Sequence, residues 1–157
     1  QRTFKIVTNT YRRFAYKNHL LFAHQWQQGP EHLYGYEADL PGARVLEQRN
    51  EEGLSYRFSY EAHPDAPTDP THSLTRVRDS LGREDVYAFK GEGGLKRLVH
   101  HQRPDGSTLA YKYNAYGQLT GQTDPLGRTT WMPRDGDGRL LAIRSPIAEA
   151  VELKYNP

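Results

Sequence analysis

The feature that most constrains the fold is a spacing of apolar, glycine and aromatic residues that recurs along most of the 157-residue chain. In each copy a leading apolar residue comes eight positions before a glycine, and an aromatic pair follows that glycine five and seven positions later. The leading residues are separated by 24, 29, 24, 21 and 21 positions, so the basic period is 21 with insertions in the turns. Self-similarity at a fixed period of this length is the sequence signature of a repeat architecture.

Three sets of residues define the copies. The leading residues are Leu21, Val45, Leu74, Leu98, Leu119 and Leu140. The glycines are Gly29, Gly53, Gly82, Gly106 and Gly127, and Ala148 takes this place in the last copy. The aromatic pairs are Tyr34 with Tyr36, Phe58 with Tyr60, Tyr87 with Phe89, and Tyr111 with Tyr113. The pair becomes Leu153 with Tyr155 after Ala148, and it decays to Met132 and Arg134 after Gly127.

The segment from Gly106 to Gly127 shows how one copy folds. Leu109, Tyr111 and Tyr113 alternate with polar residues, which places an apolar row on one face of a strand. The four residues 114–117 end in Gly117 and predict a type I turn followed by a glycine in the left-handed conformation. Asp-Pro-Leu-Gly at 124–127 predicts the next turn, because proline pre-sets φ at its second position.

The same order of strand and turn residues in the other copies predicts an all-β chain of antiparallel hairpins. The expected strands are 4–7, 20–26, 54–60, 73–79, 83–89, 96–102, 107–113, 118–123, 128–134 and 139–144. No segment has a helical period over ten residues. A compact β-sandwich remains the alternative. With 11 Tyr, 14 Gly and 10 Pro, however, the apolar area comes from aromatic rings and the composition favours a thin sheet.

Composition limits the function classes. The absence of cysteine excludes disulfides, thiolate metal sites and a cysteine nucleophile. A net charge of +2 with interspersed signs is typical of a solvated surface and does not predict nucleic-acid binding. We expect no membrane span and find no signal peptide in the first residues. Ser and Asp are frequent, but no nucleophile elbow or phosphate loop is present, so we expect no enzyme, no cofactor and no catalytic residue.

Two segments resemble metal sites. The insertion at 61–73 carries His63, Asp65, Asp69 and His72, but its three prolines predict a solvated loop without a rigid ligand set. Asp-Gly-Asp-Gly at 135–138 resembles the start of a calcium loop, although Pro146 stands where a bidentate Glu is needed and Gly138 fits the repeat's own turn. We therefore expect no bound metal.

Two other patterns have simple structural explanations. His100 and His101 are adjacent on an expected strand, so they point to opposite faces and cannot form one site by themselves. The tyrosine rows could stack on sugars, but their recurrence at every strand favours a role as the packing face of the sheet.

The repeat resembles the YD repeat of rearrangement-hotspot (Rhs) proteins and of related insecticidal toxin complexes. The resemblance rests on the pattern G-x4-Y-x-Y-[DN]-x-x-G-x-L-x7-G and is clearest over residues 73–157. Its best segments are 79–83, 113–120 and 124–128. The Asp of the YD pair is Asn114 or Asn156 in two copies, and Lys96 replaces a glycine before Leu98.

The resemblance implies that residues 1–157 form a YD-repeat segment of a larger, spiralling shell, with a Pro-rich insertion at 61–73. Such a shell encloses a toxin domain that lies outside this chain, in a bacterial polymorphic toxin made in the cytoplasm and secreted or delivered into a target cell. The implied partners are flanking YD repeats of the same or a second chain, the enclosed toxin, and spike or chaperone proteins of a secretion system used in interbacterial competition. We expect the last strand, with Val151, Leu153 and Tyr155, to pair with further repeats.

Rhs shells are similar in ending with an Asp-Pro-x-Gly-Leu segment associated with self-cleavage. Here Gly127 is followed by Arg128 and sits in an ordinary repeat turn, so the cleavage activity is not carried over. The alternative function is a carbohydrate-binding module on a cell surface.

Overall fold

A computed structural model describes residues 4–8, 12–27 and 29–155, and this part of the chain is almost entirely β-structure. Its first seven strands are β1 (Phe4–Thr8), β2 (Arg12–Lys17), β3 (Leu20–Trp26), β4 (Glu31–Tyr36), β5 (Val45–Asn50), β6 (Ser55–Ala62) and β7 (His72–Asp79). The others are β8 (Glu84–Lys90), β9 (Arg97–Gln102), β10 (Thr108–Tyr113), β11 (Leu119–Thr123), β12 (Thr129–Trp131), β13 (Ala142–Ile143) and β14 (Val151–Glu152). A single 3-10 turn, η1 (Gly93–Leu95), is the helical content of the described residues.

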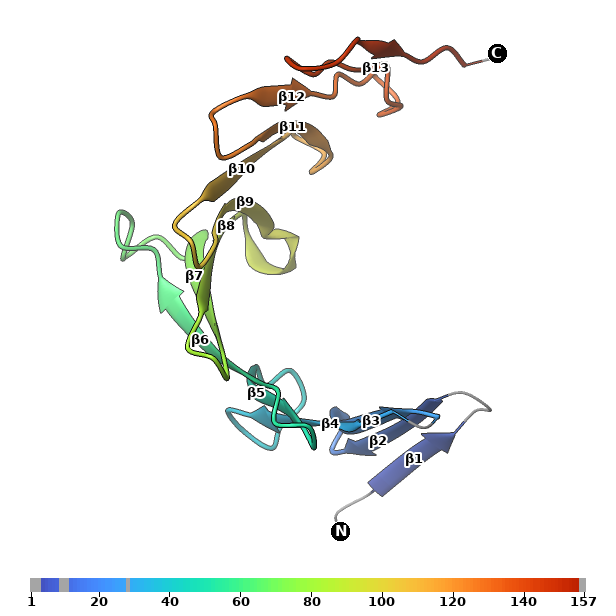
Figure 1. Ribbon diagram of the computed structural model, residues 1–157, viewed down its shortest axis with the longest axis vertical. Helices are drawn as coiled ribbons and strands as arrows, with labels where there is room; N and C mark the ends of the chain where they lie inside the picture. The colour runs from blue at the N-terminus through green and yellow to red at the C-terminus, as the bar shows by residue number, and fades with distance from the viewer. Residues whose placement is uncertain (1–3, 9–11, 28, 156–157) are drawn as a thin grey trace. The chain divides into compact units, whose positions relative to one another are not determined.

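The strands follow one another in space as they do in sequence. Strands β1 to β12 are ordered consecutively in one sheet, and β13 and β14 form a second, two-stranded sheet. The chain divides into two compact units, residues 1–59 with 76–84 and residues 60–75 with 85–157. Within each unit the neighbouring strands pair antiparallel (Figure 1). The predicted all-β chain of hairpins is confirmed, because a sandwich would require connections that skip neighbouring strands.

Most of the predicted strands are found within one or two residues of their expected bounds. The strand predicted at 20–26 is β3, and those predicted between 54 and 123 correspond to β6 to β11. The last two predictions are wrong in length, since β12 has three residues and β13 has two. Pro133 has no N–H to donate to a ladder, and the pairing here is reduced to isolated bridges from Arg134 to Leu140 and from Trp131 to Arg144.

The sheet has very little interior. The buried apolar residues among those described are Ala15, Leu20, Ala23, Leu74, Ala88, Leu109 and Ala142. Four of these seven are alanine, and no large side chain in the described part is fully buried. Burial of aliphatic surface therefore contributes less to folding stability here than in an ordinary globular core. Local hydrogen bonds and turn geometry do more to determine which strands pair.

The turns that end in Gly117 and Gly127 have the geometry that the sequence predicts. At 114–117 the Gly117 N–H donates to the Asn114 carbonyl at 3.0 Å, and the Asn114 N–H donates to the Gln118 carbonyl at 3.0 Å. Gly117 has a φ of +76°, and Gly127 has a φ of +79° in the next turn. A type I turn followed by a left-handed residue directs the chain back along the preceding strand.

Gly127→Ala should lower the free energy of unfolding by about 1–2 kcal/mol, because an L-residue at this φ brings its Cβ against the following carbonyl. An added Cβ would meet no other atom within 4 Å, so the cost comes from the backbone alone. Gly136→Ala is the matched control, since Gly136 also has open space but no positive φ. It should change stability by about 0.5 kcal/mol or less. Equal urea midpoints for the two variants would contradict this assignment.

Candidate functional site

A tyrosine hydroxyl closes the open end of the repeat hairpin. Tyr36 donates to the Leu21 carbonyl at 2.6 Å, Tyr113 to the Leu98 carbonyl at 2.8 Å, and Tyr155 to the Leu140 carbonyl at 2.9 Å. Donor and acceptor are 15 residues apart in every case, which is the distance from the leading residue to the second aromatic residue of a copy. The two positions that define the sequence repeat are thus joined physically.

Arg134 occupies this donor position in the copy that lacks a tyrosine. Its Nε donates to the Leu119 carbonyl at 3.1 Å, again across 15 residues. The sequence reads as a decayed copy here, but the structure shows that the hydrogen bond is kept while the ring is lost. This position therefore supplies a donor to the leading carbonyl in four copies, whereas Phe89, which has no side-chain donor, fills it in the copy led by Leu74.

Partial burial helps the tyrosines to act as donors. Burial raises the pKa of Tyr36, with the nearby Tyr34 adding to the effect, and burial likewise raises the pKa of Tyr113. A raised pKa keeps the phenol protonated well above neutral pH. The O–H is therefore available to the carbonyl throughout the physiological range.

A second set of bonds joins one copy to the next. The residue before the leading Leu donates to the carbonyl of a turn glycine 20 residues later, from Arg97 to Gly117 and from Gln118 to Gly138, each at 3.4 Å. Arg134 also donates to the Gly138 carbonyl at 2.8 Å. A Cβ at Gly117 would lie 2.9 Å from the tip of the Arg97 side chain, which could move aside, so glycine is needed there mainly for its positive φ.

The first aromatic residue of a copy makes lateral contacts across the sheet. The Tyr34 hydroxyl shares a hydrogen bond of 3.0 Å with Nδ1 of His24, whose ring stacks on His32 with centroids 4.7 Å apart. Tyr87 stacks on His101 at 4.3 Å. These rings form part of the packing of the sheet.

The remaining repeat residues are placed as follows. Leu74 is buried, Phe58, Tyr60 and Tyr111 are half-buried, and Phe89 lies opposite Leu98 in the ladder. Gly29 donates its N–H to the Trp26 carbonyl, and Gly53, Gly82 and Gly106 close turns with positive φ. The exposed Leu153 donates its N–H to the Leu141 carbonyl. Asn156 lies outside the described residues.

A carboxylate organises the turns that end in Gly-Arg. Oδ1 of Asp124 accepts the N–H groups of Leu126 and Arg128, and Oδ2 accepts Nε of Arg128 at 2.7 Å. Asp79 makes the equivalent bonds to Leu81 and Arg83. The hydrogen bond from the Arg128 side chain is the main reason why the pKa of Asp124 lies below its usual value.

Three consecutive tight turns fold the insertion between β6 and β7. The N–H groups of Ala66, Asp69 and His72 each donate to the carbonyl three residues earlier. Pro64, Pro67 and Pro70 occupy the second position of these turns, where their fixed φ is suitable. The described loop runs from residue 63 to 71, which is shorter than the predicted 61–73 because both strands extend into it.

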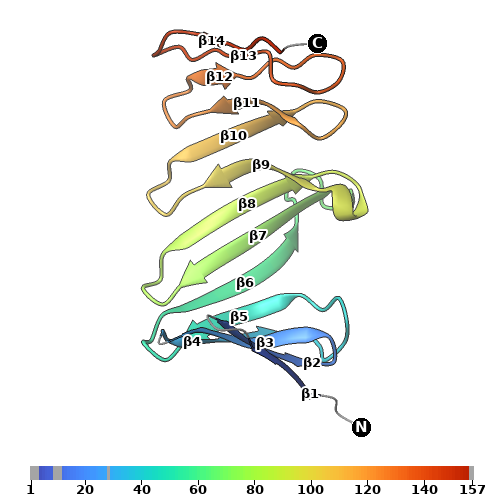
Figure 2. The ribbon, with the colours of Figure 1, turned by 90° about the vertical axis from the view of Figure 1, so that its right-hand side faces the viewer.

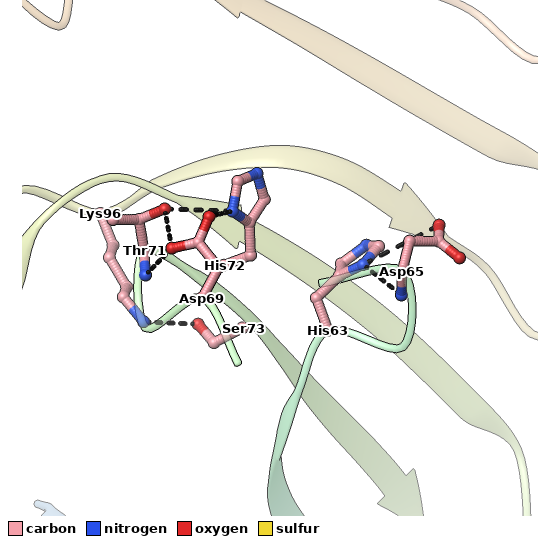
Figure 3. A network of polar contacts seen from close by, with 7 residues as sticks. All are labelled: His63, Asp65, Asp69, Thr71, His72, Ser73 and Lys96. Atoms are coloured by element: carbon pink, nitrogen blue, oxygen red, sulfur yellow. Dashed lines mark hydrogen bonds and ion pairs between the residues drawn. The ribbon is translucent and has the colours of Figure 1, made fainter. Parts of the chain in front are cut away.

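Polar contacts hold this loop against its surroundings (Figure 3). Asp69 accepts Thr71 Oγ1 at 2.7 Å and bonds His72 Nδ1 at 2.8 Å, while Lys96 donates to Ser73 Oγ at 3.0 Å. The Thr71 hydroxyl is the main cause that lowers the pKa of Asp69 to about 2, with the His72 contact a smaller one. His63 lies 3.9 Å from the Asp65 carboxylate and meets the His72 ring edge-on at 6.0 Å. These side chains brace the loop.

The structure separates the other candidate side chains. His101 bonds Asp85 at 2.6 Å, whereas His100 is exposed on the neighbouring position of β9. Asp135 Oδ1 accepts the N–H groups of Asp137 and Arg139, as in the other repeat turns. In the part of the chain that the structure describes, no three His, Cys, Asp or Glu side chains gather into a group that could hold a metal ion.

The described residues include no helix long and apolar enough to cross a membrane.

The fold and its recurring side-chain bonds define a tyrosine-rich protein of repeated β-hairpins. A family model described as RHS Repeat matches residues 94–130. The chain is also 39% identical, over 135 residues and 86% of its length, to a protein named Toxin protein Tse5 from Pseudomonas aeruginosa strain PAO1. The chain spans about a tenth of the length of that relative. The chain belongs to the Rhs, or YD-repeat, family, and it corresponds to a repeat segment of that relative.

Tyr113→Phe removes the hydroxyl that bonds the Leu98 carbonyl and keeps the ring. We expect the free energy of unfolding to fall by about 0.5–1.5 kcal/mol, the usual net value of a hydrogen bond. Tyr116→Phe is the matched control, because Tyr116 is 81% exposed at a turn tip and should cost little. Chemical denaturation measures both, and equal losses would argue against a special role for the hydroxyl at position 113.

Asp124 should make stability fall in acid. Its pKa in the folded chain lies below the ordinary 3.8, so the unfolded chain takes up the proton first as pH falls. The stabilisation by Asp124 is thus complete above the unfolded pKa of 3.8, and it is lost as the pH drops through the lower pKa of the folded chain. Asp124→Asn keeps the Oδ1 acceptor, as Asn114 does in its own turn, but cannot titrate.

Urea midpoints at pH 7 and pH 3 test this expectation. The wild-type chain should lose more stability between the two pH values than Asp124→Asn does. Lys112→Gln removes a charge that makes no carboxylate contact among the described residues, so it should keep the full wild-type loss. A wild-type loss reproduced by Asp124→Asn would rule out the contribution of this carboxylate.

Proposed function

We propose that this chain is a wall segment of a shell that encloses a toxin domain, and that its own role is structural. The observation that carries the proposal is the set of side-chain bonds repeating at the sequence period. Tyr113 closes its own hairpin on the Leu98 carbonyl, and Arg97 and Gln118 join that hairpin to the following turns. A unit that bonds mainly its immediate neighbours is suited to building an extended wall.

The comparisons support a toxin context for this wall. The relative is named a toxin, and the present chain corresponds to about a tenth of it, which leaves room for further repeats and for an active domain. We propose that residues 1–157 pair with flanking YD repeats and that the toxin lies inside. Synthesis in the bacterial cytoplasm followed by export or delivery, with spike or chaperone proteins as further partners, fits this arrangement.

The chemistry of the described residues supports a role without catalysis. The polar clusters at Asp69 and at Asp85 are each engaged in bonds that hold a loop or a strand pair. Surface aromatic rings are also engaged, since Arg12 lies 3.7 Å from the Trp26 ring centroid and Lys112 lies 4.8 Å from that of Trp131. Covered ring faces are poor platforms for sugars, which disfavours the carbohydrate-binding alternative.

A protease-protection experiment on the complete protein that carries this chain tests the shell. A variant with Tyr36, Tyr113 and Tyr155 all changed to Phe should destabilise the proposed wall by about 1.5–4.5 kcal/mol in total if the three bonds add. The toxin region should then be cleaved faster by a dilute protease than in the wild-type protein. Tyr116→Phe, with its exposed side chain, is the control and should leave protection unchanged. Rapid cleavage of the toxin region in the wild-type protein would contradict enclosure.

A further inference from the structure

One groove in the second unit combines positive charge with apolar walls, and we call it the basic groove. It has a volume of about 380 Å³ and lies where η1 and the turn between β10 and β11 meet the sheet. In Figure 2 these two turns lie at the same, right-hand ends of the strands. The lining residues are Lys90, Leu95, Arg97, Val99, Tyr111, Tyr113, Asn114, Ala115, Tyr116 and Gly117.

The charges of the basic groove are unbalanced. Lys90 at the end of β8 lies directly opposite Arg97 at the start of β9, and none of the lining residues is acidic. Like charges in directly opposed positions of a sheet repel each other. Neither side chain makes an ion pair within the described residues. The sheet therefore holds two cations side by side without compensating charge.

The Arg97 guanidinium donates hydrogen bonds through two of its three nitrogens. Its Nη1 donates to the Leu95 carbonyl at 2.9 Å and its Nε donates to the Gly117 carbonyl, while Nη2 makes no hydrogen bond to another described residue. The short bond to the Leu95 carbonyl and two longer ones of 3.4 Å, to the Gly117 and Lys96 carbonyls, orient the guanidinium. A guanidinium fixed in this way presents its free N–H groups at little further entropic cost, and carboxylate is the group that best matches them.

Apolar and aromatic surface lies beside these cations. Leu95 is 70% exposed and Tyr116 is 81% exposed, although both belong to short turns whose backbone is hydrogen-bonded. Val99 and the half-buried Tyr111 add to the lining from the strands. Large apolar side chains next to uncompensated charge are typical of a surface that recognises a mixed ligand, in which one part is anionic and the next is apolar.

We propose that the basic groove binds an extended acidic peptide segment. A carboxylate of the segment lies between Lys90 and Arg97, and a neighbouring aromatic or aliphatic side chain packs on Leu95 and Tyr116. We choose a peptide as the ligand because it complements both the positive charge and the apolar lining. A free inorganic anion would make no contact with the apolar lining. This binding goes beyond the structural role of the wall, and it does not depend on whether the wall encloses a toxin.

Fluorescence anisotropy with the intact chain tests the proposal. The probe is a labelled peptide containing Asp-Phe-Asp, and the comparison peptides contain Asn-Phe-Asn or Asp-Ala-Asp. Both replacements should weaken binding, the first through loss of charge and the second through loss of apolar contact. Lys90→Gln should weaken binding of the Asp-Phe-Asp peptide about three- to five-fold, as expected for one partly exposed ion pair. Added salt should weaken it as well.

Lys112→Gln is the matched control, because it removes the same charge from the opposite face of β10 and should leave the affinity unchanged. Thermal melting of each variant verifies that the fold is retained, and Lys90→Glu, a charge reversal at the same exposed site, should weaken binding more than Lys90→Gln. Equal binding of Asp-Phe-Asp and Asn-Phe-Asn peptides would overturn the proposal. It would also be overturned if inorganic phosphate or a uronic acid competed fully at the peptide's own concentration, or if Lys112→Gln had the same effect as Lys90→Gln.

Discussion

The bond between the second aromatic residue of a repeat and the leading carbonyl is the contact on which the rest of this structure depends. A sheet with so small an interior cannot rely on a packed core to fix where each hairpin ends. A tyrosine has two roles at this position. Its ring covers part of the sheet, and its hydroxyl donates to a carbonyl at the open end of the hairpin. The two roles can also be separated, because Arg134 makes the same bond without an aromatic ring and Phe89 supplies the ring without a hydroxyl.

The hairpins could be predicted because each is encoded locally. A glycine at a left-handed position, an acceptor side chain three residues before it and an alternating apolar row all lie within about 20 residues, and Asn114 with Gly117 illustrates this at one turn. The strands predicted at 128–134 and 139–144 are longer than β12 and β13 because the repeat spacing continues across Pro133 while the ladder does not. The missing N–H of Pro133 is visible in the sequence and outweighs the repeat there.

The side-chain clusters were harder to predict, since they depend on register and loop geometry. Prolines at every third position of the insertion do indicate successive turns, yet the contact of His72 with Asp69 arises only once those turns have formed. The basic groove depends on an irregularity between Ala88 and Phe89, which shifts the ladder by one residue and brings Lys90 opposite Arg97. The same shift precedes Tyr36 and Tyr113, so it recurs with the repeat, but the side chains that it brings opposite each other differ from copy to copy.

The short sequence range of these bonds explains how one repeat sheet can carry different surface features. The repeat bonds span 15 or 20 residues, so a change within one copy is transmitted mainly to its neighbours. The insertion at 63–71 and the turn at η1 interrupt the period, and the ladder nonetheless continues in chain order on either side. Turns of this type can therefore vary in length and charge at little cost to the strands, because distant, independent sites contribute to stability almost additively. Within a sheet of this kind, a binding site is most easily added where the chain leaves the repeat, and in the described residues the proposed groove at the Leu95 turn beside Arg97 lies at one such place.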